Sequence, residues 1–169
     1  MLLAGGFGGI IMRVMPAKST SVDKKNEFAS AFQGLRQILK PYDKKVRVVK
    51  DAPGDYMSES KTLRYLGKRV MFAAIKTKSY VSFHFFPVYM FPELAEGISP
   101  ELKKRMQGMT CWNFKKAEPG LFAELGTVVK AGLRRFEELG ERDLTREDAM
   151  AFWGSRQGQA KKSKSAKKK

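Results

Sequence analysis

Residues 69–115, RVMFAAIKTKSYVSFHFFPVYMFPELAEGISPELKKRMQGMTCWNFK, are the stretch of the chain that decides its fold. Two runs rich in β-branched and aromatic residues, Val70–Lys76 and Tyr80–Phe86, predict two strands. Only the polar residues 77–79 separate them, which is typical of a hairpin. Pro87 has no amide hydrogen to donate, so regular pairing is expected to end there.

The second half of this stretch predicts a short helix and a third strand. Ser99 supplies a hydroxyl cap and Pro100 suits the first helical position. Gly108 is placed to end that helix. In Thr110–Lys115 a period of two places Thr110, Trp112 and Phe114 on one face and Cys111 and Asn113 on the other, which indicates a strand returning to the sheet. Val88–Phe91, between two prolines, is expected to be an extended edge or a loop.

A spacing of two residues divides the second predicted strand into two unlike faces. One face is apolar, whereas the other mixes aromatic and polar side chains and is expected to border a cleft. A cleft lined by aromatic side chains suits a small ligand. Ordinary packing at the edge of the core is the alternative. The candidate cleft residues are Tyr56, Tyr80, His84 and Trp112, with Tyr65 and Tyr89 as further members.

Two long amphipathic helices are predicted on either side of the sheet segment. Apolar residues recur every three or four positions in Ser21–Leu39 and again in Pro119–Leu139. Gly34 costs the first helix about 1 kcal/mol relative to alanine. Gly126 and Gly132 are expected to let the second helix approach the sheet closely.

Shorter signals complete the predicted domain. Val46–Val49 is β-branched and predicts an edge strand, and residues 51–55 contain Pro-Gly turn chemistry. Thr145–Asp148 is a capping-box pattern that opens a short helix through Trp153. Residues 21–153 therefore predict a single compact α+β domain. Its small mixed or antiparallel sheet is packed by the N-terminal and C-terminal helices.

The ends of the chain differ in composition from this domain. Residues 1–20 are largely apolar and glycine-rich and predict a flexible extension. Met12 and Met15 offer later translation starts, which favours a mis-assigned extension over a signal peptide. No apolar run approaches 18 residues, so we expect no membrane span. A single cysteine excludes an intramolecular disulfide and agrees with the cytoplasmic location that we expect.

Positive charge is the most visible functional signal. The chain has 33 Lys and Arg against 17 Asp and Glu, a formal charge of +16. Residues 154–169 predict a disordered Lys-rich tail, which would bind nucleic-acid backbones weakly and without sequence choice by releasing counterions. A solubilising tail is the alternative. The candidate contacts are Lys161, Lys162, Lys164, Lys167, Lys168 and Lys169.

His84 and Cys111 are the only histidine and the only cysteine, and they lie on separate predicted strands. A metal site needs three or four ligands, and no third partner follows from their spacing. A cysteine nucleophile needs a neighbouring base, which requires adjacent strands and a shared face. We therefore expect a packed thiol, no cofactor, no metal and no enzymatic activity, and treat Cys/His catalysis as an outside alternative.

The order of these segments resembles the YdhG-like family of small bacterial domains, whose function is unknown. The resemblance covers about Phe28–Gly140 and rests chiefly on YVSFHFFPVY at 80–89 and LKKRMQGMTCWNFK at 102–115. It implies a compact α+β domain with helices packed on the sheet, and it supplies no catalytic motif. Some members carry a frataxin-like label, which implies an iron chaperone.

Iron binding of the frataxin type depends on an exposed acidic cluster, whereas this domain is basic. The acids closest to forming a cluster are interrupted by Arg142 and Arg146, which favours an ion-paired helix end. These acids are Glu137, Glu138, Glu141, Asp143, Glu147 and Asp148. The sequence thus predicts a non-enzymatic binding or accessory domain for a small ligand, a protein or nucleic acid. An iron chaperone is the alternative, disfavoured by the basic surface.

Overall fold

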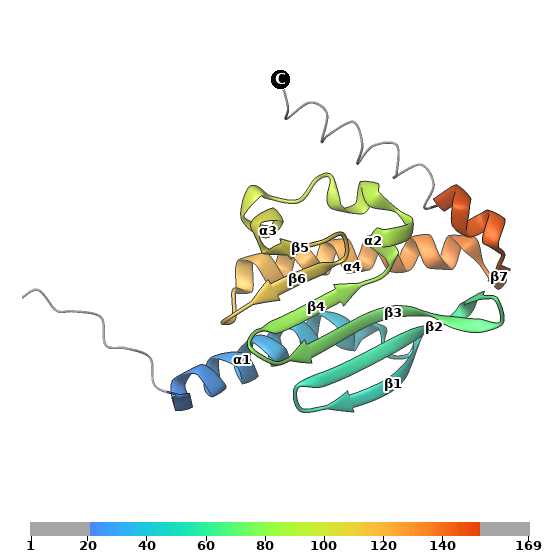
Figure 1. Ribbon diagram of the computed structural model, residues 1–169. Coiled ribbons are helices and arrows are strands. Elements are labelled where there is room, and N and C mark those ends of the chain that lie inside the picture. Colours follow the sequence, from blue (N-terminus) through green and yellow to red (C-terminus); the bar gives the residue numbers. More distant parts are fainter. Residues whose placement is uncertain (1–20, 153–169) are drawn as a thin grey trace, which may run out of the picture.

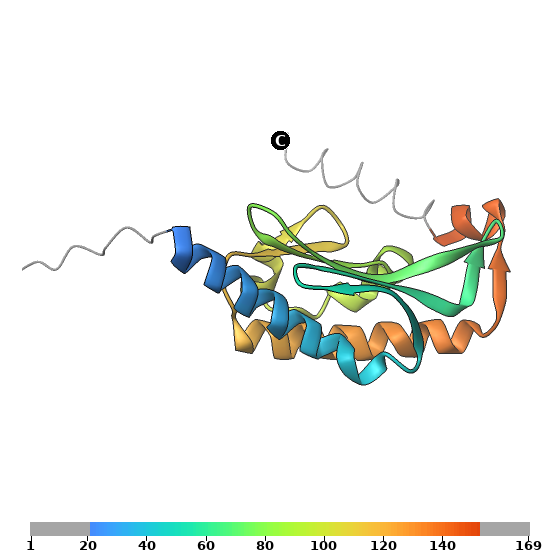
Figure 2. The ribbon, with the colours of Figure 1, turned by 90° about the horizontal axis from the view of Figure 1, so that it is seen from below.

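Two long helices pack on one face of a twisted sheet in the computed structural model of the chain, which describes residues 21–152 (Figures 1 and 2). The helices are α1 (Ser21–Leu39) and α4 (Pro119–Leu139), with the same bounds as predicted. The predicted α+β class is confirmed. The predicted extension 1–20 and the tail 154–169 lie outside the described residues, so both stay predictions.

The sheet contains seven strands within the described residues, in the order β1-β2-β3-β4-β6-β5, with β7 paired to β2. All pairs are antiparallel except β2 with β7. The predicted edge strand, hairpin and third strand are present as β1, β3–β4 and β6. The strands are β1 (Val46–Ala52), β2 (Asp55–Tyr65), β3 (Lys68–Thr77), β4 (Val81–Phe85), β5 (Met106–Gln107), β6 (Cys111–Phe114) and β7 (Arg142–Leu144).

Short helical segments connect these elements: η1 (Lys40–Tyr42), α2 (Pro87–Met90), η2 (Pro92–Ala95) and α3 (Pro100–Arg105). The prediction of an extended segment at Val88–Phe91 is wrong, because Pro87 takes the first position of α2. There its missing N–H would have had no helical partner. Val88 and Met90 are then buried against the body of the protein.

The cap predicted at the start of α3 is confirmed, since the Ser99 hydroxyl accepts a hydrogen bond from the Leu102 amide. The predicted end is wrong. The helix stops at Arg105, and Gly108, with φ +73°, instead turns β5 into β6. A positive φ is readily adopted by glycine, so the residue marks a turn rather than a helix end.

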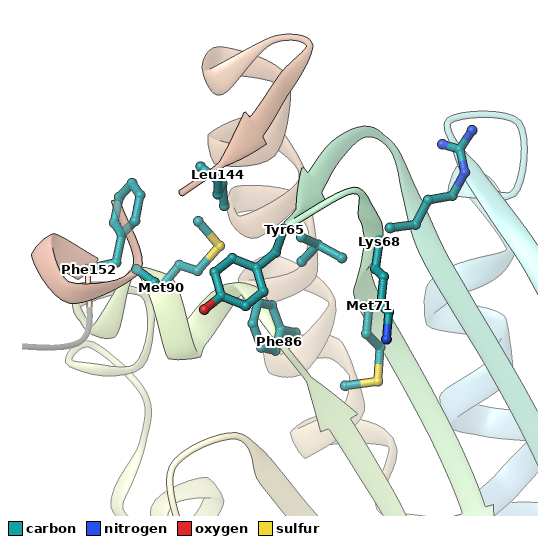
Figure 3. A pocket seen from close by; sticks show the side chains of 10 residues that line it. Tyr65, Lys68, Met71, Phe86, Met90, Leu144 and Phe152 are labelled. Atoms are coloured by element: carbon teal, nitrogen blue, oxygen red, sulfur yellow. The ribbon is translucent and has the colours of Figure 1, made fainter. Parts of the chain in front are cut away.

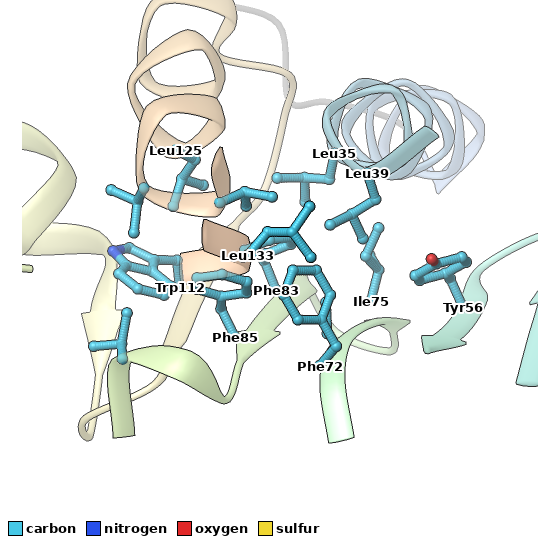
Figure 4. Close-up of a cluster of buried hydrophobic side chains, with 14 of the residues drawn as sticks. Leu35, Leu39, Tyr56, Phe72, Ile75, Phe83, Phe85, Trp112, Leu125 and Leu133 are labelled. Atoms are coloured by element: carbon cyan, nitrogen blue, oxygen red, sulfur yellow. The ribbon is translucent and has the colours of Figure 1, made fainter. Parts of the chain in front are cut away.

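The core lies between the two helices and the covered face of the sheet. Figure 4 shows Leu35 and Leu39 of α1 and Leu125 and Leu133 of α4 above the side chains of the strands. Across β2 and β3 the register jumps from Ser58–Ala73 to Glu59–Met71, which leaves Phe72 as an extra residue in a β-bulge. The bulge turns the Phe72 ring inward, 5.7 Å from the Phe136 ring of α4.

Glycine at position 132 allows close contact between α4 and the sheet, as predicted. An ideal Cβ there would lie 2.6 Å from Cζ of Phe85 and 2.9 Å from Cβ of Pro87. Gly126 faces α1 instead of the sheet, 3.7 Å from Cγ2 of Ile38. Gly34 of α1 accommodates the ring of Phe122, which explains why the helix carries a residue of low helix propensity.

The β2–β3 hairpin extends to one side of the sheet beside β7 (Figure 1). Its two turn residues, Leu66 and Gly67, have φ of 49° and 78°, as a type I′ turn requires. The β7 strand pairs with Leu63–Tyr65 on the edge of β2 that β1 leaves free. Residues 146–152 are helical after the predicted capping box, in which Thr145 and Asp148 exchange hydrogen bonds.

Within residues 21–152, no helix combines the length and apolar character needed to cross a membrane.

Candidate functional site

The four candidate cleft residues do not line one cleft. Tyr56 and Trp112 are fully buried in the core on the helix side, where Figure 4 shows them under α1 and α4 respectively. The Arg36 guanidinium lies 4.4 Å above the Tyr56 ring centroid. Tyr80 is 37% exposed just before β4, and His84 lies on the opposite face of the sheet from Trp112. Packing, the alternative given by the sequence, accounts for the two core residues.

His84 and Cys111 meet on the face of the sheet that α1 and α4 leave open. They are direct cross-strand partners on β4 and β6, and the Sγ of Cys111 lies 2.6 Å from Nδ1 of His84. Both conditions for a Cys–His pair, adjacent strands and one shared face, are therefore met. Both side chains are half-buried.

Both side chains of this pair favour their neutral forms. Burial lowers the pKa of His84, and the nearby Lys76 ammonium lowers it further. Burial also raises the pKa of the Cys111 thiol, although a contact with the Thr110 hydroxyl opposes the rise. A neutral thiol can donate to the unprotonated Nδ1 of His84, which leaves the ring proton on Nε2. The pair is thus poorly suited to a resting thiolate nucleophile.

The rate at which Cys111 is alkylated should show whether its thiol is neutral at rest. Because burial raises its pKa, Cys111 is expected to react with iodoacetamide several-fold more slowly at pH 7.4 in the native protein than in denaturant. The native rate should continue to increase above pH 9, since only the thiolate reacts. Rates measured from pH 6 to 10 test this. Fast labelling with a midpoint below pH 7 would contradict it and indicate a thiolate–imidazolium pair.

Acidic side chains do not gather into a metal site in the described part of the chain. No group of three or more His, Cys, Asp or Glu side chains there is placed to hold a metal ion. At the end of α4, Glu137 pairs with Lys45, and Glu138 pairs with Arg134 and Arg135. These pairs match the ion-paired helix end expected from the sequence.

Four cations without a salt bridge within the described residues lie near the start of β1 and along the β2–β3 hairpin. We call Lys44, Lys61, Arg64 and Arg69 the basic cluster. The Lys61 ammonium donates to the Lys44 carbonyl at 2.7 Å, and Arg69 donates to the carbonyls of Ser60 and Lys61. Arg64 and Arg69 are direct cross-strand partners. Backbone carbonyls therefore orient the Lys61 and Arg69 side chains without neutralising them.

The nearby carboxylates are engaged elsewhere. Glu59 pairs with Arg47 at 3.1 Å, and both carboxylate oxygens of Asp143 accept from the Gly67 amide. Within residues 21–152, no carboxylate lies within salt-bridge distance of any of the four basic-cluster side chains. No direct signal for this cluster is present in the sequence, because its members are spread over residues 44–69 and are separated by acidic and apolar residues.

None of three comparisons, with protein-family models, with curated proteins and with solved structures, gave a match. What can be inferred about function therefore rests on the residues of the chain itself.

Proposed function

We propose that this chain is a non-enzymatic binding domain that holds nucleic-acid phosphate backbones on the basic cluster. The observation that supports it is a group of four cations without a carboxylate partner, in a chain whose formal charge is +16. Phosphate oxygens supply the acceptors that these cations lack. Arg64 and Arg69 keep guanidinium N–H groups beyond those bonded to carbonyls, which suits bidentate contact with phosphate.

The expected binding is electrostatic and independent of base sequence. The cluster presents no exposed aromatic platform for stacking, so phosphate contacts would supply most of the affinity. The six tail lysines, Lys161 to Lys169, lie outside the described residues and would add further phosphate contacts of the same kind. Affinity should therefore fall steeply as salt rises.

Four glutamine substitutions in the full-length chain test the cluster, namely Lys44→Gln, Lys61→Gln, Arg64→Gln and Arg69→Gln together. Fluorescence anisotropy with a short DNA duplex measures affinity over a range of salt concentrations. We expect about tenfold weaker binding at 0.15 M salt. The slope of log affinity against log salt should become less steep by about 3, because nearly one counterion is released per phosphate contact.

A matched control removes the same charge elsewhere: Lys24→Gln, Lys25→Gln, Lys103→Gln and Lys104→Gln, all at exposed helix positions. This control should change affinity by about twofold at most. Equal losses in both variants would overturn the cluster as the binding site and leave only general charge attraction. Thermal melting of each variant checks that the fold persists. Glutamine at the six tail lysines separates the tail contribution from that of the domain.

The YdhG-like resemblance and the iron-chaperone alternative also stay proposals. Iron handling of the frataxin type would need exposed carboxylates free to bind cations, whereas the acids at the end of α4 are paired with Lys45, Arg134 and Arg135. Nucleic-acid binding is therefore the proposal that the described charges favour.

A further inference from the structure

An apolar cavity of about 160 Å³ lies at the hairpin end of the sheet (Figure 3). In the view of Figure 3 the Tyr65 ring lies between Met90 and Phe86, with Leu144 and Phe152 on the side of Met90 and Met71 on the opposite side. Lys68 lines the cavity too. The cavity is separate from the His84–Cys111 pair, which no part of its lining includes.

Segments far apart in the sequence form the walls of this cavity. Tyr65 and Met71 come from the hairpin, Met90 from α2, and Leu144 from β7. Ala149, from the helical residues 146–152, is 3% exposed and also lines it. The cavity therefore exists only when β7 and the following helix are packed against the hairpin.

The lining and the volume define what fits. An engineered protein cavity of about 150 Å³ lined by apolar side chains stays dry and binds benzene, so this cavity has room for about one aromatic ring. A long acyl chain would not fit. The walls are aromatic, aliphatic and thioether groups, which contact a ring favourably through dispersion and sulfur–aromatic interactions.

Two cations, Lys68 and Arg69, line this cavity. The Arg69 guanidinium donates to the Ser60 and Lys61 carbonyls, which leaves Lys68 to set the polar end of the ligand. The Lys68 ammonium makes no salt bridge within the described residues, and Asp143, the carboxylate close to the hairpin turn, accepts from the Gly67 amide. Lys68 pairs across the hairpin with Tyr65, so the cation and the phenol belong to the same part of the lining.

We propose that this cavity binds a small aromatic carboxylate, with the ring among Tyr65, Phe86 and Met90 and the carboxylate beside Lys68. Apolar burial supplies most of the affinity, and the ion pair selects the anion over a neutral ring of the same size. This activity goes beyond nucleic-acid binding. Arg69 belongs to both the cavity lining and the basic cluster, so the ligand test changes Lys68, which is not a member of the cluster, and leaves Arg69 in place.

Benzoate and the neutral benzyl alcohol are the probes. Full-length protein labelled with ¹³C at methionine methyl groups provides the readout, since Met71 and Met90 line the cavity and Met57 and Met109 do not. We expect saturable shifts confined to Met71 and Met90, with a benzoate dissociation constant of about 0.1–1 mM, as the size of the ligand allows.

Two variants separate the ring from the anion. Lys68→Gln should weaken benzoate binding about three- to fivefold and leave benzyl alcohol within about twofold, the effect of losing one solvent-screened ion pair. The matched control Lys76→Gln, on the same strand as Lys68 but not in the lining, should change neither. Ala149→Met should abolish binding of both probes by filling the cavity, while unchanged Met57 and Met109 resonances show that the fold persists.

The proposal is overturned if no saturable shift appears at about 20 mM of either probe, a concentration far above the expected dissociation constant. It is also overturned if Met57 and Met109 shift as much as Met71 and Met90, or if Lys68→Gln leaves benzoate affinity unchanged. Lys68→Gln and Ala149→Met leave all four basic-cluster residues unchanged, so the two proposals can fail separately.

Discussion

Replacing Trp112 with alanine is expected to lower the free energy of unfolding by about 3–5 kcal/mol, the range typical of a large buried aromatic residue. Trp112 is 0% exposed, and its ring centroid lies 6.2 Å from that of Phe83. Figure 4 shows its indole below Leu125 of α4. Removing the ring leaves a cavity that helix and sheet can close only by moving together. Urea denaturation followed by circular dichroism measures the change.

Two further substitutions make this result specific. His84→Ala alters the other face of the neighbouring strand, where the side chain is half-exposed, and should cost less than about 1 kcal/mol. Trp112→Phe should fall between the two, because the indole Nε1 has no hydrogen-bond partner within the described residues and its loss breaks no bond. A cost below about 1 kcal/mol for Trp112→Ala would contradict the core position and return Trp112 to the candidate cleft residues.

Gly132→Ala is expected to destabilise the protein by about 2 kcal/mol, although alanine is the better helix former. The helix propensity gain is about 1 kcal/mol, whereas forcing extra atoms into a packed core costs about 1–3 kcal/mol or more. The added Cβ would lie 2.6 Å from Phe85 and 2.9 Å from Pro87, two residues that are themselves buried. The midpoint and slope of urea denaturation give the change.

Gly126→Ala in the same helix is the matched control. Its added Cβ would meet Cγ2 of Ile38 at 3.7 Å, an ordinary van der Waals contact. This variant should therefore gain stability, by up to about 1 kcal/mol from helix propensity alone. Responses of opposite sign at the two glycines would show that contact with β4, and not helix propensity, requires glycine at 132. A gain at both positions would contradict the close approach.

Periodicity in the sequence was enough to predict α1 and α4, because each keeps one apolar stripe over about five turns. It failed for β2, whose buried face carries Ser58 and Ser60 where a strand pattern would have apolar residues. Ser58 donates to the Ala73 carbonyl and Ser60 accepts from the Leu63 amide, so both hydroxyls are satisfied inside. Hydrogen bonds between residues that the fold brings together cannot be seen in a single sequence.

The candidate site is formed by residues that are far apart in the sequence, and the sequence alone does not show which of them meet. From the sequence, a Cys–His pair could be said to require adjacent strands and a shared face. Only the register of β4 and β6 shows that His84 faces Cys111. The contiguous tail lysines drew attention to charge at 154–169, whereas the basic cluster forms where β1 begins beside the hairpin. Tyr65 was named as an aromatic candidate, but the cavity that it lines also needs Leu144, which is brought in by the parallel strand β7.

The two edges of the sheet bear on how this protein avoids aggregation. An exposed strand edge is a template for pairing with another chain. Strand β1 has Val48 and Val49 exposed, yet its register shifts between Val48 and Lys50, and Arg47 and Lys50 stand on either side of them. At the opposite edge β5 has only two residues, too few to recruit a strand. Pairing with another chain is therefore disfavoured at both edges: at β1 by the bulge and its flanking cations, and at β5 by the shortness of the strand.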